Sequence, residues 1–125
     1  MTINELLDKY HFHDSTIEEI TYDISNGKLE FIVDFCYWLQ NGYSDGDKEN
    51  GLVKLCFSSV DDYEWKTGVI DSFAILEIDI EDSAVKMNIL DAFNNKFYEI
   101  QFTCKSVEFV ECSNWCGQLC SKVHN

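Results

Sequence analysis

Apolar and polar residues alternate over most of the chain, which is the period of β-strands that bury one face. The clearest run places five apolar side chains at every second position, Leu29, Phe31, Val33, Phe35 and Tyr37. Similar runs predict strands over residues 15–24, 52–60, 76–81, 85–89 and 98–104. The last strand is expected to continue over 107–110 after a bulge. The alternation therefore predicts about six strands.

Short polar pairs separate several of these runs. Asn26-Gly27 is a strong hairpin signal because both residues tolerate the positive φ of a two-residue type I′ turn. Asp82-Ser83 and Asn94-Asn95 are predicted to be further turns. Residues 41–51 and 61–65 are interpreted as longer polar connections.

The period becomes helical at both ends of the chain. Thr2 and Glu5 match the capping box of a helix start, and an apolar stripe follows it at helical spacing, made of Ile3, Leu6, Leu7 and Tyr10. A second helical stripe follows Ser113. We therefore expect an α+β, mainly β fold, an antiparallel meander sheet of about six strands with short N- and C-terminal helices. Residues 1–125 are expected to form a single domain.

Charge limits the partners that the chain can bind. It carries 9 basic and 23 acidic residues, a net charge of −14, and all of the basic residues are lysine. Such a field repels nucleic acid, and the chain lacks the forked donor that reads phosphates and base edges. The acidity favours solubility or, more specifically, a basic protein partner that is steered by charge.

Hydropathy limits where in the cell the protein is expected to lie. There is neither an export signal nor an apolar run long enough for a membrane span, so we expect a cytoplasmic protein that makes no membrane contact. The six cysteines are accordingly expected to be reduced thiols. No cofactor is expected, and the sequence does not set the oligomeric state.

One short segment concentrates chemistry-bearing side chains, His11-Phe12-His13-Asp14-Ser15. His11, His13 and Asp14 could together bind a metal or act as an acid–base pair. Alternatively, His13, Asp14 and Ser15 are a structural motif that forms hydrogen bonds with nearby backbone groups at the junction between the helix and the first strand. The structural interpretation is favoured because the sequence contains no identifiable third ligand at a distant position and no partnered base, and no catalytic residue is assigned.

This motif also carries a resemblance. Phe-His-Asp-Ser, an isoleucine-rich strand, an Asn-Gly turn and a second strand, over about residues 10–33, resemble small bacterial domains of largely unknown function. Some of those domains are similar to immunity proteins, which neutralise toxins exchanged between competing bacteria. The resemblance implies a sheet-based cytoplasmic domain in which the motif is architectural.

The chain also pairs acids with large aromatic residues. Protein interfaces favour tyrosine and tryptophan anchors, and carboxylates beside them can receive a partner's lysines and arginines. The predicted partner-binding residues are Tyr43, Asp61, Asp62, Tyr63, Glu64 and Trp65. The alternative is that these aromatics fold back over the edge of the sheet.

A second candidate metal group lies near the C-terminus, where Cys112, Cys116, Cys120 and His124 recur at every fourth residue. Four ligands along one helix would spread over about 18 Å, too far to share one zinc ion. Buried thiols are the preferred interpretation.

Two function classes follow from the sequence. The preferred one is a non-enzymatic acidic protein-binding module, an immunity-type inhibitor of a basic toxin being one form, and the other is a small metal-dependent hydrolase or metal-binding protein using His11, His13 and Asp14.

Overall fold

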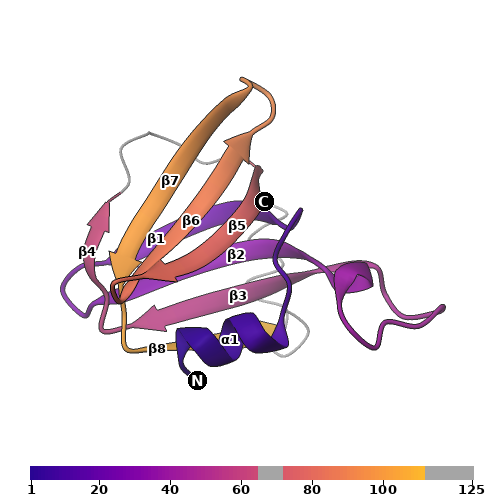
Figure 1. Ribbon diagram of the computed structural model, residues 1–125, viewed down its shortest axis with the longest axis horizontal. Helices are drawn as coiled ribbons and strands as arrows, with labels where there is room; N and C mark the ends of the chain where they lie inside the picture. The colour runs from indigo at the N-terminus through magenta and orange to yellow at the C-terminus, as the bar shows by residue number, and fades with distance from the viewer. Residues whose placement is uncertain (65–71, 112–125) are drawn as a thin grey trace.

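The computed structural model describes residues 1–64 and 72–111, which form one open antiparallel sheet and a short helix (Figure 1). The elements in chain order are α1 (Ile3–Lys9), β1 (Thr16–Asp23), β2 (Lys28–Cys36), the 3-10 helix η1 (Tyr37–Leu39), β3 (Asn50–Ser58), β4 (Asp61–Glu64), β5 (Phe73–Glu81), β6 (Ala84–Asp91), β7 (Lys96–Thr103) and β8 (Ser106–Glu111). The mainly β, antiparallel fold is confirmed. The expected C-terminal helix and the cysteines from 112 onward lie outside the described residues.

The predicted strand count was approximate, and the predicted strand order was wrong. Within the described residues the sheet has eight strands rather than about six, because residues 61–64 form the strand β4 and residues 106–111 form β8 as a separate strand. The strand order is also not one meander but β4-β7-β6-β5-β1-β2-β3-β8. The sheet thus contains two three-stranded meanders, β1–β3 and β5–β7, which meet where β1 pairs with β5.

The junction between the two meanders is narrow. Only Thr16 and Ile17 of β1 pair with β5, opposite Ala74 and Phe73. A register shift follows directly in each strand, between 17 and 19 in β1 and between 75 and 77 in β5. Such bulges bend and twist a strand, so the two meanders diverge beyond the junction. In Figure 1, β5, β6 and β7 accordingly rise steeply across β1, β2 and β3.

Each meander receives its edge strand from the other. The chain leaves β3 and, after two residues, forms β4 against β7; it leaves β7 and, after two residues, forms β8 against β3. Such short links require the ends of β3 and β7 to lie close together, so the sheet must curl strongly. The Phe57 and Phe102 rings, 4.8 Å apart, and the Lys105 N–H donated to the Ser58 carbonyl over 3.0 Å show this proximity.

The turns depart in part from the predictions. Asp82 and Ser83, both at positive φ, form the expected two-residue turn between β5 and β6. The β1–β2 and β6–β7 loops are instead four residues long, 24–27 and 92–95. Each loop is held by an aspartate at the strand end, because Asp23 and Asp91 accept hydrogen bonds from the asparagine three residues later.

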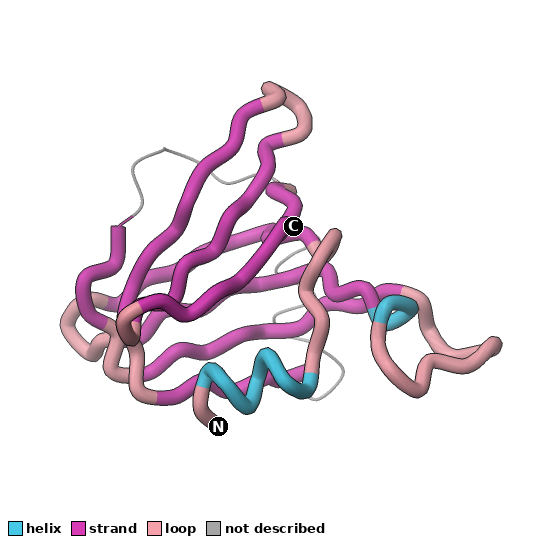
Figure 2. Tube along the Cα trace, viewed as in Figure 1, coloured by secondary structure: helices cyan, strands magenta, loops and turns pink. Residues whose placement is uncertain are grey.

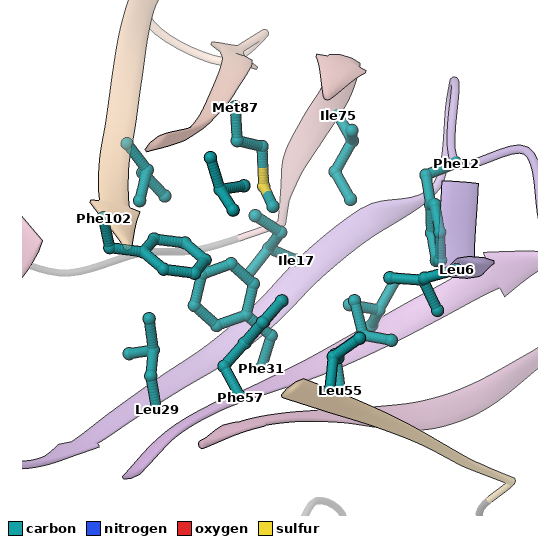
Figure 3. Close-up of a cluster of buried hydrophobic side chains, with 14 of the residues drawn as sticks. Leu6, Phe12, Ile17, Leu29, Phe31, Leu55, Phe57, Ile75, Met87 and Phe102 are labelled. Carbon is teal, nitrogen blue, oxygen red and sulfur yellow. The ribbon is translucent and has the colours of Figure 1, made fainter. Parts of the chain in front are cut away.

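The core fills the space between the curled meanders. Figure 3 shows that Phe31, Phe57, Phe102, Ile75 and Met87 converge there from both halves of the sheet. The predicted inward face of β2 is confirmed, because Leu29, Phe31, Val33 and Phe35 are all completely buried. Tyr37 was expected to continue this strand, but the chain turns into η1 there.

Helix α1 adds a cap beside the sheet and packs against β8 and β5. The predicted capping box is present, since Thr2 accepts from the Glu5 N–H and the Glu5 carboxylate accepts from the Thr2 N–H. Ile3 and Leu6 are the buried residues of this helix. It ends at Lys9, and residues 10–15 lead back to the β1–β5 junction (Figure 2).

Candidate functional site

The His11–Ser15 motif lies at the junction between the two meanders. The His13 ring bonds through Nδ1 to the carbonyl of Leu76, the residue at the β5 bulge, over 2.9 Å. The Asp14 N–H donates to the Ile75 carbonyl over 2.9 Å, and Asp14 adopts a positive φ of 68°. The motif is therefore hydrogen-bonded to β5 at the position where this strand bends.

Ser15 is the buried member of the motif, with no exposed surface. Its Oγ accepts the Cys36 N–H at the end of β2 over 3.0 Å, and its carbonyl accepts the Ile75 N–H of β5 over 2.8 Å. The hydroxyl thus satisfies a buried backbone donor that the end of β2 leaves without a strand partner. These bonds join the entrance of β1 to two other strands.

The same contacts occupy much of the motif's capacity to bind a metal. A carbonyl only accepts, so Nδ1 of His13 donates there, and Nε2 is the only nitrogen of this ring left to bind a metal. Nε2 lies 3.4 Å from an Asp14 carboxylate oxygen in an exposed contact. His11 is held through its backbone, which exchanges two hydrogen bonds with the Gln40 side chain. Within residues 1–64 and 72–111, no group of three or more His, Cys, Asp or Glu side chains is placed to hold a metal ion.

The structure separates the predicted partner-binding residues. Tyr43 lies on the loop that follows η1, where it lines a pocket of about 330 Å³ with Tyr37, Gln40 and Lys48. Asp61, Asp62, Tyr63 and Glu64 form β4 at one edge of the sheet, and Figure 1 shows this edge at the opposite side of the molecule. Trp65 lies outside the described residues.

Within β4, the aromatic side chain turns inward. The Tyr63 ring makes edge contacts with Tyr22 at 4.8 Å and Phe102 at 6.4 Å between centroids. Burial raises the pKa of the Tyr63 phenol to about 12. Asp61 and Glu64 are exposed and pair with Thr103 and Gln101 of β7. Tyr63 therefore belongs with the core, and the β4 acids belong with the opposite, solvent-facing side.

The solvent-facing side of β4 continues across β7, β6 and β5. We call this surface the outer β5–β7 face. Residues directly opposite each other in a sheet share a face, so the registers define its rows. The row nearest the β6–β7 loop is apolar: Ala74, Leu90 and Phe97. The next row is Glu77, Asn88 and Glu99. The third is Asp79, Lys86, Gln101 and Glu64.

The acidic side chains of this face have few cationic partners among the described residues. The described face holds one lysine, Lys86, and its ammonium lies 3.5 Å from Glu81 at the end of β5. Glu77 and Asp79 stand two residues apart on β5, and the pKa of Glu77 is raised by its hydrogen bond to Asp79 and by the charge of that carboxylate. The carboxylates here crowd one another and would gain from an external cation.

The face is also hollowed and partly apolar. A pocket of about 510 Å³ lies between Leu76, Glu77, Asn88, Phe97 and Glu99. Phe97 is 68% exposed, and Phe93 on the adjoining loop is 97% exposed. Sequence reasoning did not single out these two residues. A signal existed for Phe97, because it shares the parity of Glu99 and Gln101 rather than that of the buried Ile100 and Phe102.

The fold and this face together define an open antiparallel sheet protein with one acidic, partly apolar side. Comparison of the chain with protein-family models, curated proteins and solved structures found no match. In the part of the chain that the structure describes, no helix is both long and apolar enough to cross a membrane.

Proposed function

We propose that this protein is a non-enzymatic binding protein that holds a basic protein partner against the outer β5–β7 face. The observation that supports this most is the combination on one face of exposed carboxylates, Glu64, Glu77, Asp79 and Glu99, with the exposed ring of Phe97. Protein interfaces commonly combine aromatic anchors with charged residues that complement the charges of the partner.

The charge of the chain supports the same partner. A net charge of −14 accelerates encounter with a basic surface and slows approach to an acidic one. The carboxylates at the face would then fix the orientation of the bound partner. Asp61 and Asp62 lie on the adjoining edge strand β4 and extend the acidic region toward the rim.

An immunity-type inhibitor of a basic toxin is the specific form of this function that the Phe-His-Asp-Ser resemblance suggests. In that role the protein would cover a functional surface of the toxin by binding alone. Tyr43 and its pocket lie on the loop after η1, on the side of the molecule opposite the β4 edge (Figure 1), and are not part of this interface.

The test is binding to the protein encoded by the neighbouring gene, measured by calorimetry at low and moderate salt. Glu77→Lys together with Glu99→Lys should weaken binding at least tenfold, since each replaces an attraction with a repulsion. Asp8→Lys with Asp45→Lys, two exposed acids away from the face, makes the same change in net charge and is the control. Equal loss in both double variants would reduce the effect to net charge and refute the site.

The inhibitor form has its own readout. Co-expression of this protein should restore growth to cells that produce the neighbouring toxin, and the Glu77→Lys/Glu99→Lys variant should not restore it. Full rescue by that variant, at equal protein levels, would show that the outer β5–β7 face is not the inhibitory surface.

A further inference from the structure

The β6–β7 loop presents two phenylalanine rings to solvent. Phe93 is 97% exposed in the loop, and Phe97, the second residue of β7, is 68% exposed. Figures 1 and 2 show this loop at the end of the two strands, where it projects from the body of the sheet. Single exposed apolar residues are common on proteins, but two large exposed aromatics within five positions place much apolar surface at one projecting tip.

Hydrogen bonds to Asp91 restrain the loop that carries Phe93. Asp91 is 5% exposed, and one of its carboxylate oxygens accepts the N–H groups of Phe93 and Asn94, both over 3.1 Å. The other oxygen accepts from the Asn94 side chain over 2.7 Å. Asn95 completes the turn at a positive φ of 54°. These hydrogen bonds restrain the backbone at Phe93 in the free protein, which lowers the entropy that binding must remove.

The tip adjoins the acidic face at its apolar row. Phe97 pairs with Leu90 on that row, and the next row toward the sheet centre carries Glu99 and Glu77. A partner that received Phe93 would therefore meet apolar surface first and carboxylates next. This order fits an apolar cleft bordered by lysines or arginines.

We propose that Phe93 is the anchor of the interface and inserts into an apolar cleft of the basic partner, with Asp91 as the residue that positions it. This inference rests on the proposed function and names the part of the surface that provides specificity. A second copy of this chain does not fit as the occupant, because pairing two such faces would place carboxylates against carboxylates.

The other four-residue hairpin loop provides a matched control. Residues 23–28 and 91–96 share the pattern Asp-x-x-Asn-x-Lys, and in both loops the aspartate accepts hydrogen bonds from the asparagine. Ile24 on the first loop is 77% exposed. The two loops thus present an exposed apolar residue on the same kind of turn, at different places on the molecule.

The experiment places a photo-reactive phenylalanine analogue at position 93 or 24 of the full-length chain in cells of the native host. Position 93 should cross-link to a basic protein, and position 24 should not. That partner is then purified, and its dissociation constant is measured with Phe93→Ala, Ile24→Ala and Asp91→Ala. We expect Phe93→Ala to weaken binding by a factor of about 30 or more, as hot-spot residues do. Ile24→Ala should leave the constant unchanged, and Asp91→Ala should weaken it by a smaller factor.

The outcomes separate this inference from the proposed function. If Glu77→Lys with Glu99→Lys abolishes binding while Phe93→Ala does not change it, the anchor is refuted and the acidic face stands. If the partner depends on Phe93 but is acidic, the proposed function fails and the anchor stands. Cross-linking at position 24 alone, or to a second copy of the chain, would overturn the anchor.

Discussion

Replacing Ser15 with alanine should destabilise the protein more than its small change in volume suggests. The residue is completely buried, and its Oγ is the acceptor for the Cys36 N–H at 3.0 Å. Alanine removes the oxygen without adding a clash, but it leaves the Cys36 N–H buried without that acceptor. An unsatisfied buried donor of this kind costs about 1–3 kcal/mol of unfolding free energy.

This cost can be expressed as a melting temperature. A chain of 125 residues has an unfolding entropy of about 0.26 kcal/mol/K, so each kcal/mol lowers Tm by about 4 °C. Ser15→Ala should therefore lower Tm by about 4–11 °C in a calorimetric or circular dichroism melt. Ser25→Ala, at an exposed position on the β1–β2 loop, should change stability by no more than about 0.5 kcal/mol.

Amide hydrogen exchange locates the effect. In Ser15→Ala the Cys36 N–H should exchange faster relative to other β2 amides, because its acceptor is gone. If Tm falls by less than about 2 °C and Cys36 exchange is unchanged, the hydroxyl does not hold the β1 entrance to β2. The structural interpretation of the motif would then lose its strongest contact.

Three further predictions concern backbone strain and titration. Asp14→Gly should preserve or raise Tm while Asp14→Ala lowers it, because φ at this position is 68°; equal Tm values for the two would contradict this. Gly27→Ala should cost about 1–2 kcal/mol in denaturant unfolding, since φ is +62° and the new Cβ would lie 3.3 Å from the Val60 nitrogen; a neutral result would mean that the loop relaxes freely. Tyr63 has a folded pKa of about 12 against an ordinary value of 10.0, so it contributes stability that is complete below pH 10 and lost as pH rises toward 12. Tyr63→Phe should therefore shift the alkaline unfolding midpoint upward and Tyr43→Phe should not, and coincident midpoints would refute the assignment.

Much of the fold was readable from local pattern. Alternation alone identified the buried face of β2, because a strand that buries one side must repeat every second residue. The α1 capping box was equally local. In both cases the residues that determine the structure are neighbours in sequence, so no knowledge of distant contacts was needed.

The strand order and β4 were not readable in this way. Asp61–Glu64 has one apolar residue among four, and it becomes a strand because β7 offers it backbone partners. The exchange of edge strands depends on the curl of the whole sheet, and no short window of sequence encodes that curl. For the binding surface, sequence parity could have located Phe97. The sequence did not indicate that Phe93 lies exposed on a restrained loop, because that follows from the hydrogen bonds that Asp91 accepts in the folded structure.

The exchange of edge strands has a consequence for how the chain can be divided. A cut between β4 and β5 would give one fragment with β1–β3 and β4, and another with β5–β7 and β8. Each fragment would then hold the edge strand that the other needs. Neither fragment should fold alone, but the two should reassemble when mixed, because each supplies a strand that completes its partner's sheet. The two halves of the protein thus already exchange edge strands. The same arrangement would allow two whole chains to exchange these strands at high concentration.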